Sequence, residues 1–113
     1  MDKKAKQLPE AFFYILLAVQ KPNHGYGIIR EVEELTKGRV VLSPGTVYGA
    51  IQSLLEKEWI AIYSAELEFR KRKKYLITSE GLVTFNKERA RLEELLQNAS
   101  LVKWNCEKVK FHL

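Results

Sequence analysis

The first strongly apolar stretch of the chain begins two residues after Pro9 and reads AFFYILLAVQK. Its apolar residues occupy nearly every face of a helix, whereas a surface helix of a globular protein carries one apolar stripe. Proline is favoured at the first position of a helix because the N–H that it lacks needs no partner there. The pattern predicts a helix from Pro9 that is buried on more than one side, and one protomer is not expected to cover all of it.

The spacing of apolar residues predicts a second and a third helix. The second lies between the breaker cluster KPNHG at 21–25 and a stop signal at 37–38, and its apolar residues are Ile28, Ile29, Val32 and Leu35. A brief extended segment at 40–42 leads to Ser43 and Pro44, a capping residue followed by a proline in the first helical turn. The third helix is expected to begin there.

The third helix is predicted to have two different faces. Its apolar stripe consists of Val47, Ile51, Leu54 and Leu55. Its opposite face consists of Gly45, Tyr48, Gly49 and Gln52. A glycine inside a helix costs about 1 kcal/mol relative to alanine, and close approach of another molecule is the explanation that we favour for Gly49. For Tyr48 a partly buried core position is the alternative to such a contact.

Two segments with weak alternation of apolar and polar residues predict a β-hairpin. They span residues 60–63 and 74–77, and the run RKRKK at 70–74 lies at the hairpin tip or in its second strand. Three helices followed by a hairpin is the order of a winged helix-turn-helix, in which the hairpin is called the wing. The sequence therefore predicts a mainly α domain with a small β-hairpin wing over residues 1–78.

A long final helix is expected from Ser79, with Thr78 as its cap. Counting in sevens gives a seam of eight positions, Phe85, Glu88, Leu92, Leu95, Ala99, Val102, Cys106 and Val109, of which all but Glu88 are apolar or small. If it is helical to Lys110, this segment is about 45 Å long, more than so small a domain can cover. We predict that residues 79–113 form a C-terminal dimerisation helix. The alternative is a helix that folds back on its own core.

The positive charge of the chain is concentrated in one place. The sequence has 19 basic and 14 acidic residues, a net charge of +5, and removing the five basic residues at 70–74 leaves 14 against 14. A charge run is often only a solvated surface. Because strand-like residues flank this one, contact with phosphates, which releases counterions, is the other interpretation.

Composition and residue spacing limit the other classes of function. The 113 residues, 46% of them apolar, suffice for one domain with a modest core. The chain has no apolar run of about 20 residues, no cleavage signal near its start and only one cysteine, so we expect a cytoplasmic protein without a membrane segment.

His24, His112 and Cys106 lack the spacing of a metal site, and His24 is interpreted as a structural or capping residue. We expect no metal, no cofactor and no enzyme activity, because no catalytic set of residues is present.

Four separate elements of the sequence resemble one protein family. They are His24-Gly25-Tyr26, the segment SPGTVY at 43–48, the basic run that ends in Tyr75, and Thr78 with Gly81. In this order they resemble the PadR family of bacterial transcriptional regulators, and in particular its smaller members, in which about one long helix follows the winged domain. The resemblance implies a winged-helix homodimer that binds an operator in double-stranded DNA, usually as a repressor, and releases it when a small-molecule effector binds.

The chain departs from the family pattern at three points. Gly49 stands where a proline commonly follows the tyrosine of the third helix, and Lys74 precedes Tyr75 where a tyrosine pair is common. The wing tip also lacks the usual glycine. These differences concern the hairpin and the base contacts more than the fold.

The predicted DNA-binding surface combines the third helix with the wing. A helix N-terminus carries partial positive charge, so the corner at 43–46 can receive a phosphate, while Tyr48 contacts a phosphate, a sugar or a thymine methyl group and Gln52 contacts an adenine edge. The predicted DNA-binding residues are Ser43, Pro44, Gly45, Thr46, Tyr48, Gly49, Gln52, Arg70, Lys71, Arg72, Lys73 and Lys74. The predicted dimerisation residues are Phe12, Phe13, Leu16, Phe85, Leu92, Leu95, Leu96, Ala99 and Val102.

The function expected from these observations is sequence-specific DNA binding by a homodimeric, ligand-responsive repressor. The alternative is a winged-helix protein-interaction module that binds no specific DNA. In that case the basic wing meets an acidic partner or keeps the protein in solution.

Overall fold

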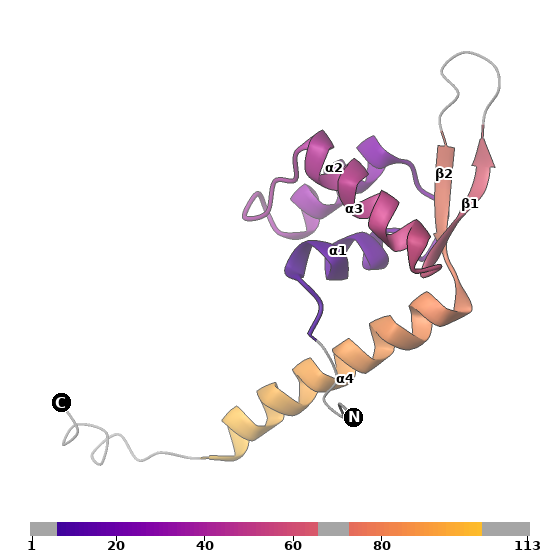
Figure 1. Cartoon of the computed structure of the whole chain (residues 1–113). Coiled ribbons are helices and arrows are strands. Elements are labelled where there is room, and N and C mark those ends of the chain that lie inside the picture. The colour runs from indigo at the N-terminus through magenta and orange to yellow at the C-terminus, as the bar shows by residue number, and fades with distance from the viewer. Residues whose placement is uncertain (1–6, 66–72, 103–113) are drawn as a thin grey trace.

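The computed structural model of the protein describes residues 7–65 and 73–102. Its elements in chain order are α1 (Glu10–Ala18), α2 (Gly25–Leu35), α3 (Pro44–Glu56), β1 (Ile60–Ala65), β2 (Lys73–Ile77) and α4 (Ser79–Leu101), as labelled in Figure 1. Three helices, a two-stranded hairpin and a long helix follow one another as expected. The predicted winged helix-turn-helix with a long C-terminal helix is confirmed.

The core lies where α1 passes between α4 and the pair formed by α2 and α3 (Figure 1). The largest fully buried side chains are Ile15, Leu16, Val19, Ile28, Val32, Val47, Leu54 and Ile60. Contact with helices on more than one side explains why α1 is apolar on nearly every face. Leu16 was predicted to be a dimerisation residue, and this prediction is corrected, because Leu16 is fully buried within the protomer.

Side-chain caps define where three of the helices begin. His24, Ser43 and Thr78 precede α2, α3 and α4, and each accepts a hydrogen bond from the backbone amide three residues ahead, at 3.0–3.1 Å. Such a bond satisfies one of the amides that a helix start leaves without a partner. The expected capping roles of these residues are confirmed, whereas Pro9 is the N-cap of α1 and not its first helical residue.

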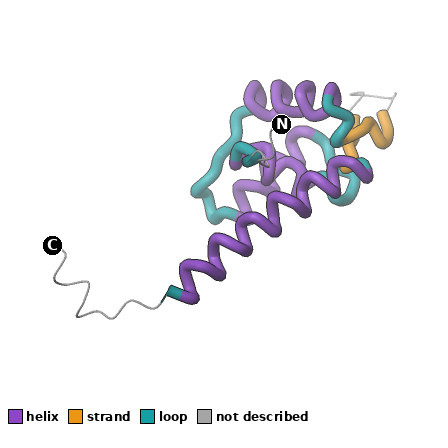
Figure 2. The backbone as a smooth tube through the Cα atoms, turned by 60° about the horizontal axis from the view of Figure 1, so that its bottom comes forward, coloured by secondary structure: helices purple, strands orange, loops and turns teal. Residues whose placement is uncertain are grey.

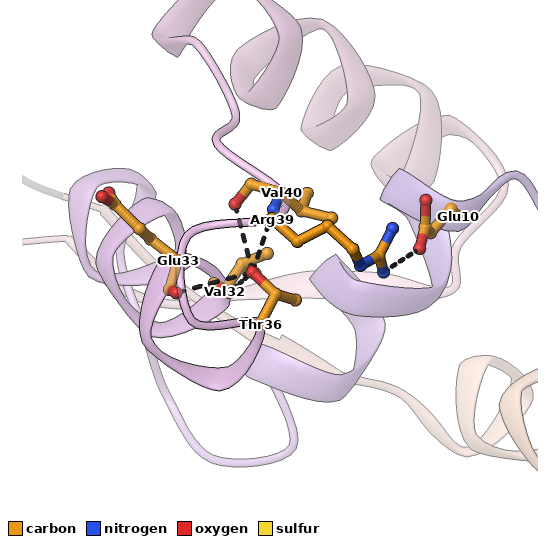
Figure 3. Close-up of polar contacts among 6 residues, drawn as sticks. All are labelled: Glu10, Val32, Glu33, Thr36, Arg39 and Val40. Carbon is orange, nitrogen blue, oxygen red and sulfur yellow. Dashed lines mark hydrogen bonds and ion pairs between the residues drawn. The ribbon is translucent and has the colours of Figure 1, made fainter.

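The connection from α2 to α3 is held by a threonine hydroxyl and an ion pair (Figure 3). Thr36 Oγ1 donates to the carbonyl of Val32 at 2.9 Å and accepts from the amide of Val40 at 3.0 Å. Arg39 binds the carboxylate of Glu10 on α1 at 2.5 Å. Both charged side chains are more than half exposed, so the pair contributes less to stability than the buried contacts beneath it. The segment at 40–42, expected to be extended, forms no strand.

The hairpin is antiparallel and contains one irregularity. Ile60 pairs with Ile77 at its base, and the register shifts between Ile62 and Ser64, so Tyr63 between them has no partner in the opposite strand. An extra residue of this kind is a β-bulge, which bends and twists a strand. A short β-bridge between Asn23 and Tyr75 joins β2 to the residues before α2.

The long helix α4 leaves the core partway along its length (Figures 1 and 2). Glu88 is its last buried residue, 6% exposed, and the following Arg91 binds both oxygens of its carboxylate at 2.7 and 3.0 Å. The helix is about 34 Å long at 1.5 Å per residue and ends at Leu101, earlier than expected. Residues 103–113, which include the seam positions Cys106 and Val109, lie outside the described part of the chain.

Candidate nucleic-acid interface

The two predicted faces of α3 are present in the structure. The buried face consists of Val47, Ala50, Ile51 and Leu54. The exposed face consists of Gly45, Tyr48, Gly49 and Gln52, as the sequence predicted. Because the buried residues fix the rotation of the helix against the core, the opposite face is presented to the surroundings in one orientation.

The two glycines of this face are surrounded by open space. In the described part of the chain, a Cβ atom built on Gly45 or Gly49 would meet no neighbouring atom within 4 Å, and neither residue has a positive φ. Neither the backbone nor the packing of the protomer therefore requires glycine at these positions. A flat helix surface of this kind suits the close approach of a second molecule.

The N-terminus of α3 lies at the edge of the same face. All four residues from Ser43 to Thr46 are exposed. Ser43 Oγ accepts from the amide of Thr46 at 3.1 Å and donates to the Thr46 hydroxyl at 3.0 Å. A helix N-terminus with its partial positive charge turned to the surface favours an approaching anion such as a DNA phosphate.

Tyr48 differs from the sequence-based expectation in where its hydroxyl lies. The side chain is 43% exposed, but the end of its ring lies against Gly25 at the start of α2. The side chain is therefore partly buried, which agrees with the second of the two alternatives, and its contact with DNA stays a prediction. A contact between residues so far apart in the chain has no local sequence signal.

The predicted basic residues of the wing fall partly within the described structure. Lys73 is exposed and Lys74 is half-buried, and both belong to β2. Arg70, Lys71 and Arg72 lie outside the described residues. The two described lysines place positive charge on the strand next to Tyr75, a residue that is 6% exposed. Burial raises the pKa of Tyr75, and nearby Tyr48 adds to the rise.

Two exposed tyrosines on the neighbouring elements α2 and β1 were not among the DNA-binding residues predicted from the sequence. Tyr26, 55% exposed, lies in the first turn of α2, next to the Gly25 on which Tyr48 rests. Tyr63, 59% exposed, is the bulged residue of β1. Phenolic hydroxyls are common donors to DNA phosphates. A tyrosine close in sequence to a basic run was the available signal for Tyr63.

The predicted dimerisation residues separate into two groups. Leu92, Leu95, Leu96, Ala99 and Val102 are exposed and continue the core-facing side of α4 beyond the point where α1 ends its contact. Phe85 is 4% exposed and stacks on half-buried Phe13, with ring centroids 4.8 Å apart. Phe85 therefore belongs to the core of the protomer, like Leu16, and its assignment to the dimer surface is corrected. Phe12 is half-buried and remains near the surface of α1.

The described residues contain neither a cluster of metal-ligating side chains nor a membrane-spanning helix. Across 7–65 and 73–102, no group of three or more His, Cys, Asp or Glu side chains is arranged to hold a metal ion. Within the same ranges, no helix has the length and apolar character needed to cross a membrane.

The match to a family model decides what kind of protein this is. The model of the transcriptional regulator PadR-like family matches residues 15–87, from the middle of α1 into α4. The chain belongs to the PadR-like family. Members of the PadR-like family are transcription regulators and not enzymes, so the resemblance seen in four short motifs and the expectation about enzyme activity are both confirmed.

Solved structures of transcriptional regulators have a similar fold. A transcriptional regulator from Clostridium thermocellum is 25% identical with a TM-score of 0.66, over 83% of this chain and 93% of that one. A PadR family transcription regulator from Clostridium difficile R20291 is 25% identical with a TM-score of 0.65, over 83% of this chain and all of that one. No curated protein gives a significant match to the chain.

A third structure resembles the chain in fold alone. BpsR from Bordetella bronchiseptica is 19% identical with a TM-score of 0.65, over 93% of this chain and 74% of that one. Its structure is described as a mechanism for regulation of DNA binding by 6-hydroxynicotinic acid.

Proposed function

We propose that this PadR-like chain is a sequence-specific DNA-binding repressor that acts as a homodimer and releases its operator when a small molecule binds. The observation that carries the proposal is the exposed face of α3. Tyr48 and Gln52 lie on the same exposed face as Gly49, and within residues 7–65 and 73–102 no atom lies within 4 Å of a Cβ atom built on that glycine. In helix-turn-helix proteins the second helix of the motif enters the major groove, and α3 has that place in the chain.

Side-chain chemistry indicates which residues contact bases and which contact phosphates. Gln52 offers an amide that can bond an adenine edge in two places and so select a base. Tyr26, Tyr63 and Lys73 are suited to phosphates, which set position and affinity without reading sequence. The corner of Ser43 and Thr46 adds a helix N-terminus to the phosphate contacts.

Homodimer formation is supported by the exposed apolar stripe on the outer half of α4. Leu95 and Leu96 are 53% and 69% exposed, and Leu92 continues the stripe back to the core. Burying such side chains is favourable, and a second α4 offers the same stripe in a two-fold arrangement. Two copies of α3 held in this way would match half-sites about one helical turn, or about 34 Å, apart on DNA.

Release by a small molecule is supported by a cavity next to this stripe. The cavity has a volume of about 340 Å³ and lies between α1 and α4. Its lining includes apolar Leu8, Phe13 and Leu92 together with the polar groups of Tyr14 and Arg91. A ligand that binds there contacts both the first helix and the proposed dimerisation helix, so it can change the spacing of the two α3 helices.

The proposal is tested by selecting DNA fragments from the source genome with the purified full-length protein. The expected result is recovery of a site with two inverted half-sites, and two protomers bound per site in a mobility-shift titration. Binding to all fragments without preference, at any salt concentration, contradicts sequence-specific repression. Absence of binding even at low salt favours the alternative of a protein-interaction module.

A further inference from the structure

The phenol of Tyr48 lies directly on the backbone at the start of α2. A Cβ atom built on Gly25 would be 2.2 Å from the Tyr48 hydroxyl oxygen and 2.4 Å from the ring carbon that bears it. Real Cβ atoms do not approach other atoms this closely, so any side chain at position 25 must push the ring away. Gly25 has no positive φ, and its backbone conformation therefore gives no reason of its own for glycine.

The residues directly before α2 are also attached to the wing. The amide of Asn23 donates to the carbonyl of Tyr75 at 3.1 Å, and the amide of Tyr75 donates to the carbonyl of Asn23 at 2.7 Å. This pair of bonds makes the bridge between the start of α2 and β2. Because Tyr75 lies in the strand that carries Lys73 and Lys74, the position of the wing is tied to Asn23.

The side chain of Asn23 is itself held in place. Its amide nitrogen donates to the carbonyl of Ala18 and to the carboxylate of Glu31, each at 3.1 Å. Its amide oxygen accepts from the amide of His24 at 3.0 Å. Within three residues of chain, 23–25, the structure therefore joins the end of α1, the body of α2, the wing and the exposed face of α3.

Tyr75 reaches this segment through its backbone, and Tyr48 reaches it through the end of its ring. Tyr75 is 6% exposed, and its burial, with a smaller contribution from Tyr48, raises its pKa. Tyr48 of α3 and Tyr75 of β2 are thus both in contact with residues 23–25.

We propose that Gly25 is a positioning residue for DNA recognition, which allows Tyr48 to rest on α2 and so holds the exposed face of α3 and the wing in one fixed relation. The inference rests on the proposed function of α3 and the wing as DNA-contacting elements. It concerns the geometry between two contact surfaces, and it assigns Gly25 no contact with DNA. Pre-organised contact surfaces bind more tightly because less ordering remains to be done on binding.

The test is a double-mutant cycle with Gly25→Ala, Tyr48→Ala and the double variant, measured on the selected duplex and on an unrelated duplex. We expect Gly25→Ala to lose at least about tenfold in affinity for the selected duplex and less than about twofold for the unrelated one, because the basic wing residues are unchanged. The double variant should bind like Tyr48→Ala, since the methyl group then meets no ring. Wild-type binding by Gly25→Ala, or losses that simply multiply in the double variant, would overturn the proposal.

Thermal unfolding of the same variants without DNA separates this inference from the proposed function. Gly25→Ala should change Tm less favourably in the wild-type background, where the Tyr48 ring must make room for the methyl group, than in the background of Tyr48→Ala, where no ring meets it. If the wild-type protein prefers no duplex, the proposed function fails. Even in that case, the Tm values of the four proteins test whether a methyl group at position 25 meets the Tyr48 ring. Equal changes in Tm on Gly25→Ala in both backgrounds would overturn the contact on which the inference depends.

Discussion

Arg91 binds both carboxylate oxygens of Glu88, at 2.7 and 3.0 Å, at the point where α4 leaves the core. Glu88 occupies a seam position that is apolar elsewhere along the helix, and it is almost completely buried. A buried carboxylate is costly unless it is paired and hydrogen-bonded, and Arg91 supplies both bonds from the next turn of α4. The pair thus marks the boundary between the part of α4 that packs in the protomer and the part proposed to pair with a second copy.

Replacing Arg91 by alanine should lower the free energy of unfolding by about 1.5–3 kcal/mol, because the buried Glu88 carboxylate then loses two charge-assisted hydrogen bonds. Urea denaturation at pH 7 followed by far-UV circular dichroism measures the change. Arg89→Ala is the matched control, since Arg89 is 61% exposed and lies 3.9 Å from Glu93, and a change within about 0.5 kcal/mol is expected for it. Equal losses in the two variants would show that the ion pair has no special role.

The stability of the protein should also depend on the protonation of Glu88. Hydrogen bonds from Arg91 hold the pKa of the Glu88 carboxyl below its ordinary value, although burial acts in the opposite direction. The stabilisation is therefore present above the unfolded-state pKa of about 4.3 and is lost as pH falls through the lower folded-state value.

Chemical denaturation of the wild type and of Glu88→Gln at several values between pH 7 and pH 3 tests this dependence. The wild type should lose more stability than Glu88→Gln below about pH 4.3, because only the wild type has this group to protonate. Parallel losses in the two proteins would assign the acid sensitivity to other carboxylates.

The exposed stripe of α4 predicts the effect of an introduced charge on assembly. Leu95→Asp should give monomers in sedimentation equilibrium, because a carboxylate in the proposed apolar interface has no partner. Val83→Asp is the matched control, since Val83 is 55% exposed and lies on the side of α4 opposite Gly81 and Phe85. Dimers that persist in Leu95→Asp, or dissociate equally in Val83→Asp, would place the interface elsewhere.

Local signals in the sequence predicted the helix starts and the fold. Ser43 and Thr78 cap helices through bonds to residues three positions ahead, so a short stretch of sequence contains the whole interaction. The two faces of α3 were likewise predictable, because Val47 and Leu54 repeat at helical spacing. The order of three helices and a hairpin then left few arrangements open, and the family motifs agreed with it.

Contacts between distant segments could not be predicted in the same way. The apolar residues of α1 surround the helix, so their pattern did not show that Leu16 faces the core while Phe12 stays nearer the surface. A count in sevens does not distinguish seam positions that pack against α1 from those farther along α4. It therefore assigned Phe85 to the dimer surface, although Phe85 packs in the core of the protomer. The packing of Tyr48 on Gly25 depends on how two helices meet, and neither residue alone indicates it.

The basic wing should add affinity for DNA without adding sequence preference. Lys73→Ala should weaken binding to the selected and the unrelated duplex by similar factors, and it should reduce the slope of log K against log salt by about 0.9, because one fewer phosphate is neutralised. Fluorescence anisotropy titrations between about 50 and 200 mM salt measure both effects. Lys87→Ala is the control, because Lys87 is an exposed lysine of α4 away from the wing, and no change in slope is expected for it. An unchanged slope in Lys73→Ala would remove β2 from the proposed interface.

The most direct test of the account is the affinity of Gln52→Ala for the selected and the unrelated duplex, measured side by side at one salt concentration. Gln52 is exposed on the face of α3 that is proposed to enter the major groove. The account predicts a loss of about 1–3 kcal/mol, or roughly 5- to 150-fold, for the selected duplex only, since a base-edge contact carries sequence preference and little general affinity. Equal affinities of the wild type and Gln52→Ala for the selected duplex, or equal losses for both duplexes, would contradict the claim that this face of α3 reads DNA sequence.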